Sequence, residues 1–173
     1  MIYLFQLILY FGIYFHMDKI DYKILAELQA DNSLSSQALA ERVGLSTSPC
    51  WRRVRKLEND GIISANVAIL KPDKVGLDVI AIANISLEDH HPDSVSEFDE
   101  MVKSRPEILE CYAMSGQHDY LIKVVCGSIR AYDVLLAQHI LQCKAVHTVN
   151  TSFVMRSTKY TTALPLDVEA LEN

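Results

Sequence analysis

The chain has 173 residues, half of them apolar, and a formal net charge of −6. This length allows one large domain or two small ones with buried cores, and the acidic balance argues against a protein that coats nucleic acid. The charge is uneven: residues 18–70 hold seven basic and seven acidic side chains, whereas residues 71–173 hold nine basic and fifteen acidic ones. A local cationic surface in the N-terminal half is therefore compatible with an acidic protein.

The first 16 residues are almost all apolar and contain no Asp, Glu, Lys or Arg. They lack the basic start and small-residue end of a signal peptide, and they are shorter than the about 20 apolar residues that span a membrane. We interpret residues 1–16 as an over-extended start, with Met17 as the true beginning. The alternative is a segment that binds a membrane surface or a partner. We expect no membrane association and a cytoplasmic protein.

Two helical patterns follow Met17, over residues 18–29 and from about residue 35 to residue 43. Their apolar side chains recur at helical spacing. These side chains are Ile20, Ile24, Leu25, Leu28, Leu39 and Val43. Gly44 is placed to end the second helix in a left-handed conformation. Such a helix followed by a tight turn is typical of the first half of a helix-turn-helix motif.

A third helix is predicted after this turn, with Ser48 as its cap, Pro49 in its first turn and Gly61 at its end. Its spacing separates two faces. The inward face carries Cys50, Val54 and Leu57, and the outward face carries Trp51, Arg52, Arg55 and Lys56, with Arg53 at the margin. An apolar-anchored helix with a basic outer face is typical of a recognition helix that enters the DNA major groove.

Arginine side chains contact phosphates or read guanine O6 and N7, and hydroxyl groups at a helix start bind phosphate. The predicted DNA-binding residues are Ser36, Ser46, Thr47, Ser48, Pro49, Trp51, Arg52, Arg53, Arg55 and Lys56. A basic helix face that is merely solvated is the alternative interpretation. Residues 63–70 then change to a strand-like pattern, which we interpret as a wing or linking strand, and residues 71–78 are a turn-rich linker.

The second half alternates between strand and helix patterns. Strands are predicted over residues 79–87, 108–114, 119–126 and 146–159. One helix opens with a capping-box pattern over Ser94–Glu97, and another is capped by Ser128 and runs to Ile140. The order β-α-β-β-α-β is the ferredoxin-like plan, an antiparallel sheet with both helices on one face. The uncovered sheet face predicts a homodimer.

The predicted fold class is therefore α+β. A winged helix-turn-helix domain over residues 17–70 precedes a ferredoxin-like domain over residues 79–165, and residues 166–173 form a tail. No C-x-x-C pair occurs, so the cysteines are expected to be buried thiols in a reducing compartment. The pair His90–His91 beside Glu88 resembles a metal site, but Pro92 indicates a solvent-exposed loop. We expect no metal, no cofactor and no catalytic residues.

Three stretches carry a combined motif: MDKIDYKIL from Met17, VGLSTSPCWRRVRKLENDGII from Val43, and ECYAMSGQHDYLIK from Glu110. Together with the order of elements, they resemble the Lrp/AsnC, or feast/famine, family of transcriptional regulators. The resemblance covers residues 17 to about 165. It implies that the partners are double-stranded DNA, an amino-acid effector and further copies of the chain, as dimers that assemble into tetramers or octamers. The tail KYTTALPL from Lys159 resembles a bacterial subset that includes regulators of amino-acid degradation.

The resemblance also implies an effector site at interfaces between dimers, near the turn Ser115–Asp119. Asp119 would meet the ammonium group of an amino acid, and backbone N–H groups at Gly116 would meet its carboxylate. The implied effector-binding residues are Ala113, Met114, Gly116, Gln117, His118, Asp119, Ser152 and Phe153. Gln117 stands where the family often has an acid. A plain tight turn between two strands is the alternative interpretation.

Two functions fit this architecture. The first is a sequence-specific DNA-binding regulator that responds to an amino acid or related metabolite. The second is an enzyme similar to the siroheme decarboxylases, which share the architecture. The basic cluster from Arg52 to Lys56 favours the regulator, because an enzyme has no need of it, and no nucleophile–base pairing or phosphate-binding loop is visible.

Overall fold

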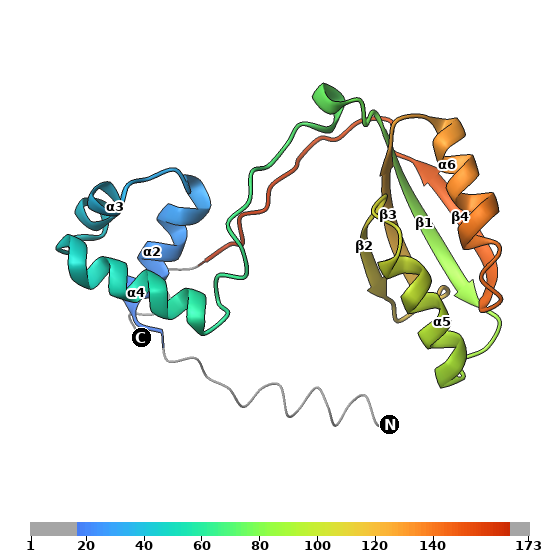
Figure 1. Ribbon diagram of the computed structural model, residues 1–173, viewed down its shortest axis with the longest axis horizontal. Helices are drawn as coiled ribbons and strands as arrows, with labels where there is room; N and C mark the ends of the chain where they lie inside the picture. The colour runs from blue at the N-terminus through green and yellow to red at the C-terminus, as the bar shows by residue number, and fades with distance from the viewer. Residues whose placement is uncertain (1–16, 167–173) are drawn as a thin grey trace. The chain divides into compact units, whose positions relative to one another are not determined.

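The computed structural model describes residues 17–166, so the predicted leader over residues 1–16 and most of the predicted tail lie outside the described residues. The described chain forms two compact units (Figure 1). One contains the residues up to Ala68 together with the segment from Tyr160 onward, and the other contains Ile69–Lys159. The segment from Tyr160, expected to complete the ferredoxin-like domain, therefore groups with the N-terminal helices.

The N-terminal unit contains the helices α2 (Lys19–Ala30), α3 (Ser36–Val43) and α4 (Thr47–Asn59). Each of the first two begins at a side chain that accepts hydrogen bonds from otherwise unpaired backbone N–H groups. Asp18 accepts from Ile20 and Asp21 at the start of α2, and the Asp21 carboxylate accepts in return from the backbone of Asp18. Ser35 caps α3 through the backbone N–H of Ala38. These caps fix the first two helices where the sequence predicts them.

The turn between α3 and α4 contains Gly44 in the predicted left-handed conformation, with φ of 74°. The start of α4 differs from the prediction. The helix begins at Thr47 with Ser46 at the cap position, so Ser48 is not the cap and Pro49 is the third helical residue. This position tolerates proline because the first N–H groups of a helix have no intrahelical acceptor.

The core of this unit lies between the three helices. Its buried side chains are Ile24, Leu25, Leu39, Ala40, Val43, Cys50 and Leu57. The predicted inward face of α4 is confirmed for Cys50 and Leu57, and Val54 is half-buried against the same cluster. Leu166, the last described residue, also packs against this core.

The prediction of a strand over residues 63–70 is wrong for this structure. The segment forms no strand, and Val67, Ile69 and Leu70 are exposed. A strand requires a partner for its backbone N–H and C=O groups, and this segment pairs with no other described strand. A short 3-10 turn (Pro72–Val75) follows, ended by Gly76 at φ of 75°.

The second unit has the predicted β-α-β-β-α-β order. Its elements are β1 (Val79–Leu87), α5 (Pro92–Lys103), β2 (Ile108–Ala113), β3 (Tyr120–Cys126), α6 (Ile129–Leu135) and β4 (Val146–Phe153). The four strands form one antiparallel sheet in the order β2-β3-β1-β4. The ferredoxin-like plan is confirmed.

Three boundaries in this unit differ from the predictions. Helix α5 begins at Pro92, with His91 rather than Ser94 as its cap. A π-helical turn (Leu136–Ile140) follows α6, so the predicted helix is continuous in direction but not in hydrogen-bonding pattern. Strand β4 ends at Phe153, which pairs with Ala81, and residues 154–159 are irregular. The reason is that β1 begins at Val79, so it extends only two residues beyond this last pair.

Both helices pack on one face of the sheet. Phe98 of α5 and Tyr132 of α6 belong to one buried cluster with alternate residues of β1 and β3, among them Ala83 and Ile122. The intervening residues, such as Ile82 and Leu121, point to the opposite face, where they are only half-buried. Among the described residues, no helix is long and apolar enough to cross a membrane.

Candidate DNA-binding helix and effector turn

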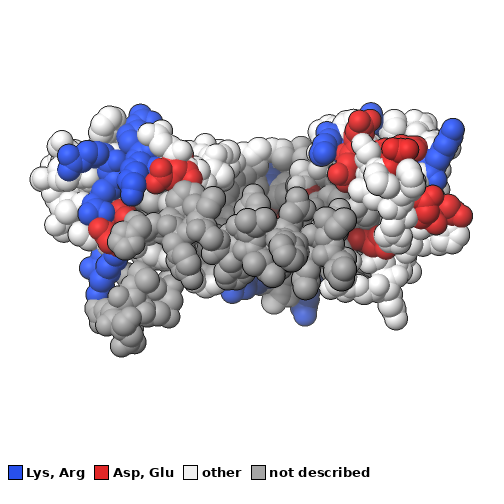
Figure 2. All heavy atoms as spheres, turned by 90° about the horizontal axis from the view of Figure 1, so that it is seen from below, with Lys and Arg blue, Asp and Glu red and all other residues white. Residues whose placement is uncertain are grey.

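Helix α4 presents a basic outer face. Trp51 is 50% exposed, and Arg52, Arg55 and Lys56 are exposed as well. Figure 2 shows Lys and Arg side chains gathered on the N-terminal unit, with a few carboxylates among them. The predicted outward face is therefore present, on a helix whose opposite side is held in the core by Cys50.

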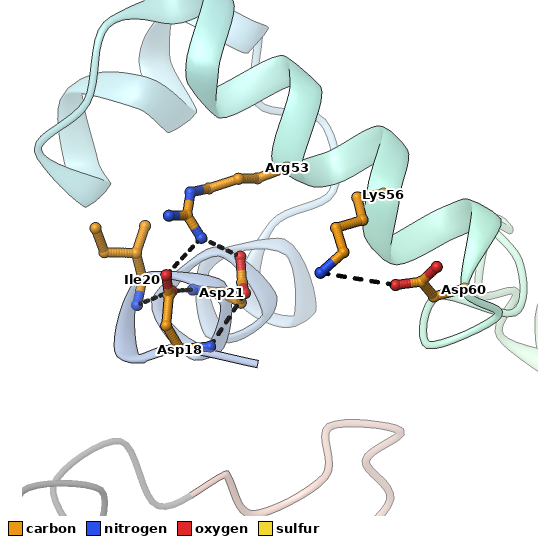
Figure 3. Close-up of polar contacts among 6 residues, drawn as sticks. All are labelled: Asp18, Ile20, Asp21, Arg53, Lys56 and Asp60. Carbon is orange, nitrogen blue, oxygen red and sulfur yellow. Dashed lines mark hydrogen bonds and ion pairs between the residues drawn. The ribbon is translucent and has the colours of Figure 1, made fainter. Parts of the chain in front are cut away.

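The basic residues of α4 differ in their partners. Arg53 turns from α4 to the start of α2, where its Nη1 lies 2.7 Å from Asp21 Oδ1 and 2.8 Å from Asp18 Oδ2 (Figure 3). Asp21 is only 5% exposed. Its hydrogen bond to the guanidinium raises the pKa of Arg53 further above its ordinary value. Arg53 thus joins α4 to α2, which sets the direction in which the recognition helix points.

Two other basic residues pair within α4 itself. Arg55 Nη1 lies 2.9 Å from Glu58 Oε2, and its guanidinium carbon lies 5.4 Å from the centre of the Trp51 ring. Lys56 Nζ lies 4.0 Å from Asp60 Oδ2 (Figure 3). Exposed pairs of this kind contribute little, about 0.5 kcal/mol or less, so they exchange readily for phosphate. Arg52 makes no ion pair with any described residue, so its charge faces solvent.

The hydroxyl groups predicted to meet DNA are also accessible. Ser46, Thr47 and Ser48 at the start of α4 are exposed, and so is Ser36 at the start of α3. Ser46 makes no capping hydrogen bond, so the first N–H groups of α4 are not satisfied by its side chain. Pro49 is half-buried. A helix start with unpaired N–H groups and nearby hydroxyls is suited to an anion.

The predicted effector turn joins β2 to β3, and Asp119 is bonded at both carboxylate oxygens. Its Oδ2 accepts from the backbone N–H of Leu87 at 2.8 Å, and its Oδ1 accepts from Nε2 of His90 at 2.8 Å. The Leu87 hydrogen bond and then the His90 contact lower the pKa of Asp119 below its ordinary range, against the opposing effect of burial. Asp119 thus fastens the loop after β1 to the turn.

The other residues of the turn are more open. Nδ1 of His118 shares a hydrogen bond of 3.2 Å with Oγ of Ser86. Ala113, Met114 and Gln117 are exposed. Gly116 does not have a positive φ, and there is open space where a Cβ would be, so neither a left-handed conformation nor crowding requires glycine there.

Ser152 and Phe153 are not brought to this turn within one chain. They lie on β4, at the edge of the sheet opposite to β2. Phe153 pairs with Ala81, whereas the turn lies at the other end of β1, near Ile85. Ser152 and Phe153 also point to opposite faces of the sheet, because Phe153 stacks edge-on with Tyr132 of the helical face at 5.3 Å between ring centres. A pocket with all the predicted effector residues needs more than one copy.

Sequence reasoning missed two residues that the structure places in these sites. The first is Asp21, although the D-x-x-D spacing of Asp18 and Asp21 predicts two carboxylates near one helix start. His90 was considered only as a metal ligand. Among residues 17–166, no group of three or more His, Cys, Asp or Glu side chains is placed to hold a metal ion.

A helix-turn-helix unit with a basic outer helix, joined to a ferredoxin-like unit, defines a DNA-binding protein with a second domain. Comparisons give the particular class. Residues 17–64 match the model of a winged helix-turn-helix DNA-binding domain, and residues 80–164 match the Lrp/AsnC ligand-binding domain. The chain belongs to the Lrp/AsnC family of DNA-binding transcriptional regulators.

Relatives match over nearly their whole length. The DNA-binding transcriptional activator DecR of Escherichia coli is 41% identical, covering 87% of this chain and 99% of its own. The leucine-responsive regulatory protein of Klebsiella pneumoniae is 37% identical, covering 86% and 90%. These relatives are regulators, and nothing among them supports the decarboxylase alternative.

Solved structures agree. An AsnC family transcriptional regulator from Agrobacterium tumefaciens has a TM-score of 0.83 and 44% identity, covering 88% of this chain and 99% of that one. A transcriptional regulator from Neisseria meningitidis, solved in complex with L-methionine, has a TM-score of 0.84 and 36% identity, covering 87% and 97%.

Proposed function

We propose that this regulator reads its operator with α4 and responds to an amino acid through a pocket that includes the turn before β3. The observation that supports the DNA-binding part of the proposal is that neighbouring arginines of α4 have different partners. Arg53 holds the helix to α2, while Arg52 extends to solvent without an ion pair to any described residue. A pre-positioned helix with an available guanidinium is what major-groove readout requires.

The individual contacts follow from these partners. Arg52 reads a base edge or binds a phosphate, and Arg55 and Lys56 exchange their weak intrahelical pairs for phosphates. The hydroxyls of Ser36, Ser46, Thr47 and Ser48 and the open start of α4 bind the DNA backbone, with Pro49 and Trp51 in apolar contact beside them. Arg53 acts by positioning the helix. Because the ligand is chromosomal DNA, the proposal also places the protein in the cytoplasm.

For the effector we propose an L-amino acid. Its ammonium group takes the place of His90 at Asp119 Oδ1, and its carboxylate binds backbone N–H groups of the turn at Gly116 and Gln117. Ala113, Met114 and His118 complete this side of the pocket, and Ser152 and Phe153 are supplied by another copy. The L-methionine complex of the Neisseria relative supports an amino acid as the class of ligand.

The proposal includes a homodimer that assembles further into a tetramer or octamer. Support comes from the sheet face opposite to the helices. Ile80, Ile82, Leu121 and Val125 lie there on the adjacent strands β1 and β3, with Asn84 and Lys123 on the same face. A largely apolar face of this kind is covered most simply by the same face of a second copy.

The test is binding of the full chain to the DNA upstream of its own gene, with scrambled DNA as control, at two salt concentrations and with a panel of amino acids. We expect selective, salt-sensitive binding that one amino acid changes. Arg52→Ala is expected to weaken this binding, and Arg130→Ala, which removes an exposed arginine from the other unit, is its matched control. Equal binding to upstream and scrambled DNA would contradict the proposal.

A further inference from the structure

The described chain ends against α2, through a contact between two residues 135 positions apart. The side-chain amide of Gln29 donates from Nε2 to the carbonyl oxygen of Leu164 at 3.2 Å, and the N–H of Leu164 donates to Oε1 of the same amide at 2.6 Å. One glutamine thus satisfies both backbone groups of one residue, as a neighbouring strand would.

The side chains next to this contact are divided between core and solvent. Leu166 packs against the helical core of the N-terminal unit, whereas the side chain of Leu164 is 69% exposed. The N–H of Leu166 donates to the carbonyl oxygen of Leu164 at 2.9 Å, so a tight turn delivers Leu166 to the core. Residue 164 is therefore held by its backbone and residue 166 by its side chain.

This segment continues from the sheet of the other unit. Strand β4 ends at Phe153, and only residues 154–159 separate it from the segment that groups with the helices. The two units are consequently joined twice, by the chain that leaves α4 and by the chain that leaves β4. Ser152 and Phe153, both proposed to contact the effector, stand at the beginning of the second connection.

We propose that residues 160–166 form a strap that docks on the DNA-binding unit and restrains it relative to the ligand-binding unit. Its role in DNA binding rests on the proposed function. In a dimer, the restraint keeps the second DNA-binding unit near its half-site once the first has bound, which raises its effective concentration. Undocking therefore weakens binding to paired half-sites and leaves binding to a single half-site unchanged.

Docking is measured by hydrogen exchange of the peptide that contains residues 160–166, in full-length wild type and in Gln29→Ala. The variant leaves that peptide unchanged and removes its partner. Losing the two hydrogen bonds is expected to speed exchange on the order of tenfold. Gln142→Ala is the matched control, because Gln142 also donates to a backbone carbonyl, that of Ala137, but in the other unit. Equal exchange in wild type and Gln29→Ala would overturn docking.

The restraint is measured by DNA-binding titrations of Leu166→Asp and of its control Leu164→Asp. Each variant is titrated against the upstream DNA and against the same DNA with one half-site scrambled. We expect Leu166→Asp to bind the paired site several-fold more weakly and the single half-site as wild type does, whereas Leu164→Asp matches wild type on both. Faster exchange without any change on the paired site would overturn the restraint. If wild type itself fails to select this DNA while the exchange difference is present, the proposed function fails and the docked strap stands.

Discussion

Arg53 and Asp21 lie 32 residues apart in the sequence and 2.7 Å apart in the structure. The carboxylate is almost fully buried, and it also completes the capping box of α2 by accepting from the backbone of Asp18. One contact therefore fixes both the start of the first helix and the direction of the recognition helix. Arg53 therefore has a structural role in the DNA-binding unit, although it belongs to the basic cluster from Arg52 to Lys56.

Arg53→Ala is expected to destabilise the N-terminal unit, because it leaves the buried Asp21 carboxylate without its cation. The expected loss is about 1–3 kcal/mol in the free energy of unfolding. Urea unfolding followed by circular dichroism measures it. Arg52→Ala, one residue earlier and without an ion pair to a described residue, should unfold within about 0.5 kcal/mol of wild type. Equal unfolding of the two variants would contradict a structural role for Arg53.

Arg52→Ala is expected to weaken operator binding while the protein remains folded. Loss of a base contact costs about 1–3 kcal/mol and relaxes selectivity at one position, whereas loss of a phosphate contact weakens all sequences alike and lowers the salt slope by about 1. Fluorescence anisotropy at several salt concentrations distinguishes these outcomes. Wild-type affinity and salt slope in the variant would show that Arg52 does not touch DNA.

Glu58→Gln is expected to strengthen DNA binding. The substitution removes the carboxylate that pairs with Arg55 and also a negative charge on the recognition helix, so Arg55 no longer exchanges a partner when it meets phosphate. We expect a gain of several-fold at low salt that shrinks as salt rises, with unfolding changed by no more than about 0.5 kcal/mol. Unchanged affinity at low salt would mean that Arg55 lies away from the DNA.

The lowered pKa of Asp119 predicts how stability depends on pH. A carboxyl group whose pKa falls on folding stabilises the native state above its unfolded pKa, and the contribution is lost as pH falls through the folded pKa. Asp119→Asn should therefore be less stable than wild type near neutral pH, and the difference should shrink below about pH 4. Thermal melts across this range measure it. A difference that stays constant down to acid pH would assign the effect to something other than this charge.

His90→Ala is expected to raise the affinity for the effector. It frees Asp119 Oδ1, which the ammonium group is proposed to occupy, and leaves the Leu87 hydrogen bond in place. Calorimetric titration of the full chain with L-leucine and L-methionine measures this affinity, and His91→Ala is the neighbouring control.

Asp119→Ala is expected to blunt the response of DNA binding to the effector and to leave DNA binding itself intact. An unchanged response would put the pocket elsewhere.

Features set by neighbouring residues were predictable from the sequence. The two faces of α4 follow from a 3.6-residue period, and the left-handed turn at Gly44 follows from the one residue type that adopts it freely. The order of strands and helices follows from changes between periods of two and 3.6.

Features that depend on distant partners were not predictable in this way. Residues 63–70 have the sequence pattern of a strand, but a strand also requires a neighbouring strand to pair with, and the local pattern does not show whether one is present. The bonds from Arg53 to Asp21, from His90 to Asp119 and from Gln29 to Leu164 join residues 32, 29 and 135 positions apart. No periodicity connects such pairs. Ser152 and Phe153 are likewise distant in sequence from the turn Ser115–Asp119. Only the family resemblance placed them in one site with that turn.

The place of Leu166 in the helical core has a consequence for the order of folding during synthesis. Ribosomes release a chain from its N-terminus, and domains generally fold as they emerge. Helices α2, α3 and α4 leave the ribosome before the sheet, yet the leucine that packs against their core is made only after the whole sheet. A nascent chain therefore acquires its finished DNA-binding unit only after the sheet of the ligand-binding unit has been translated.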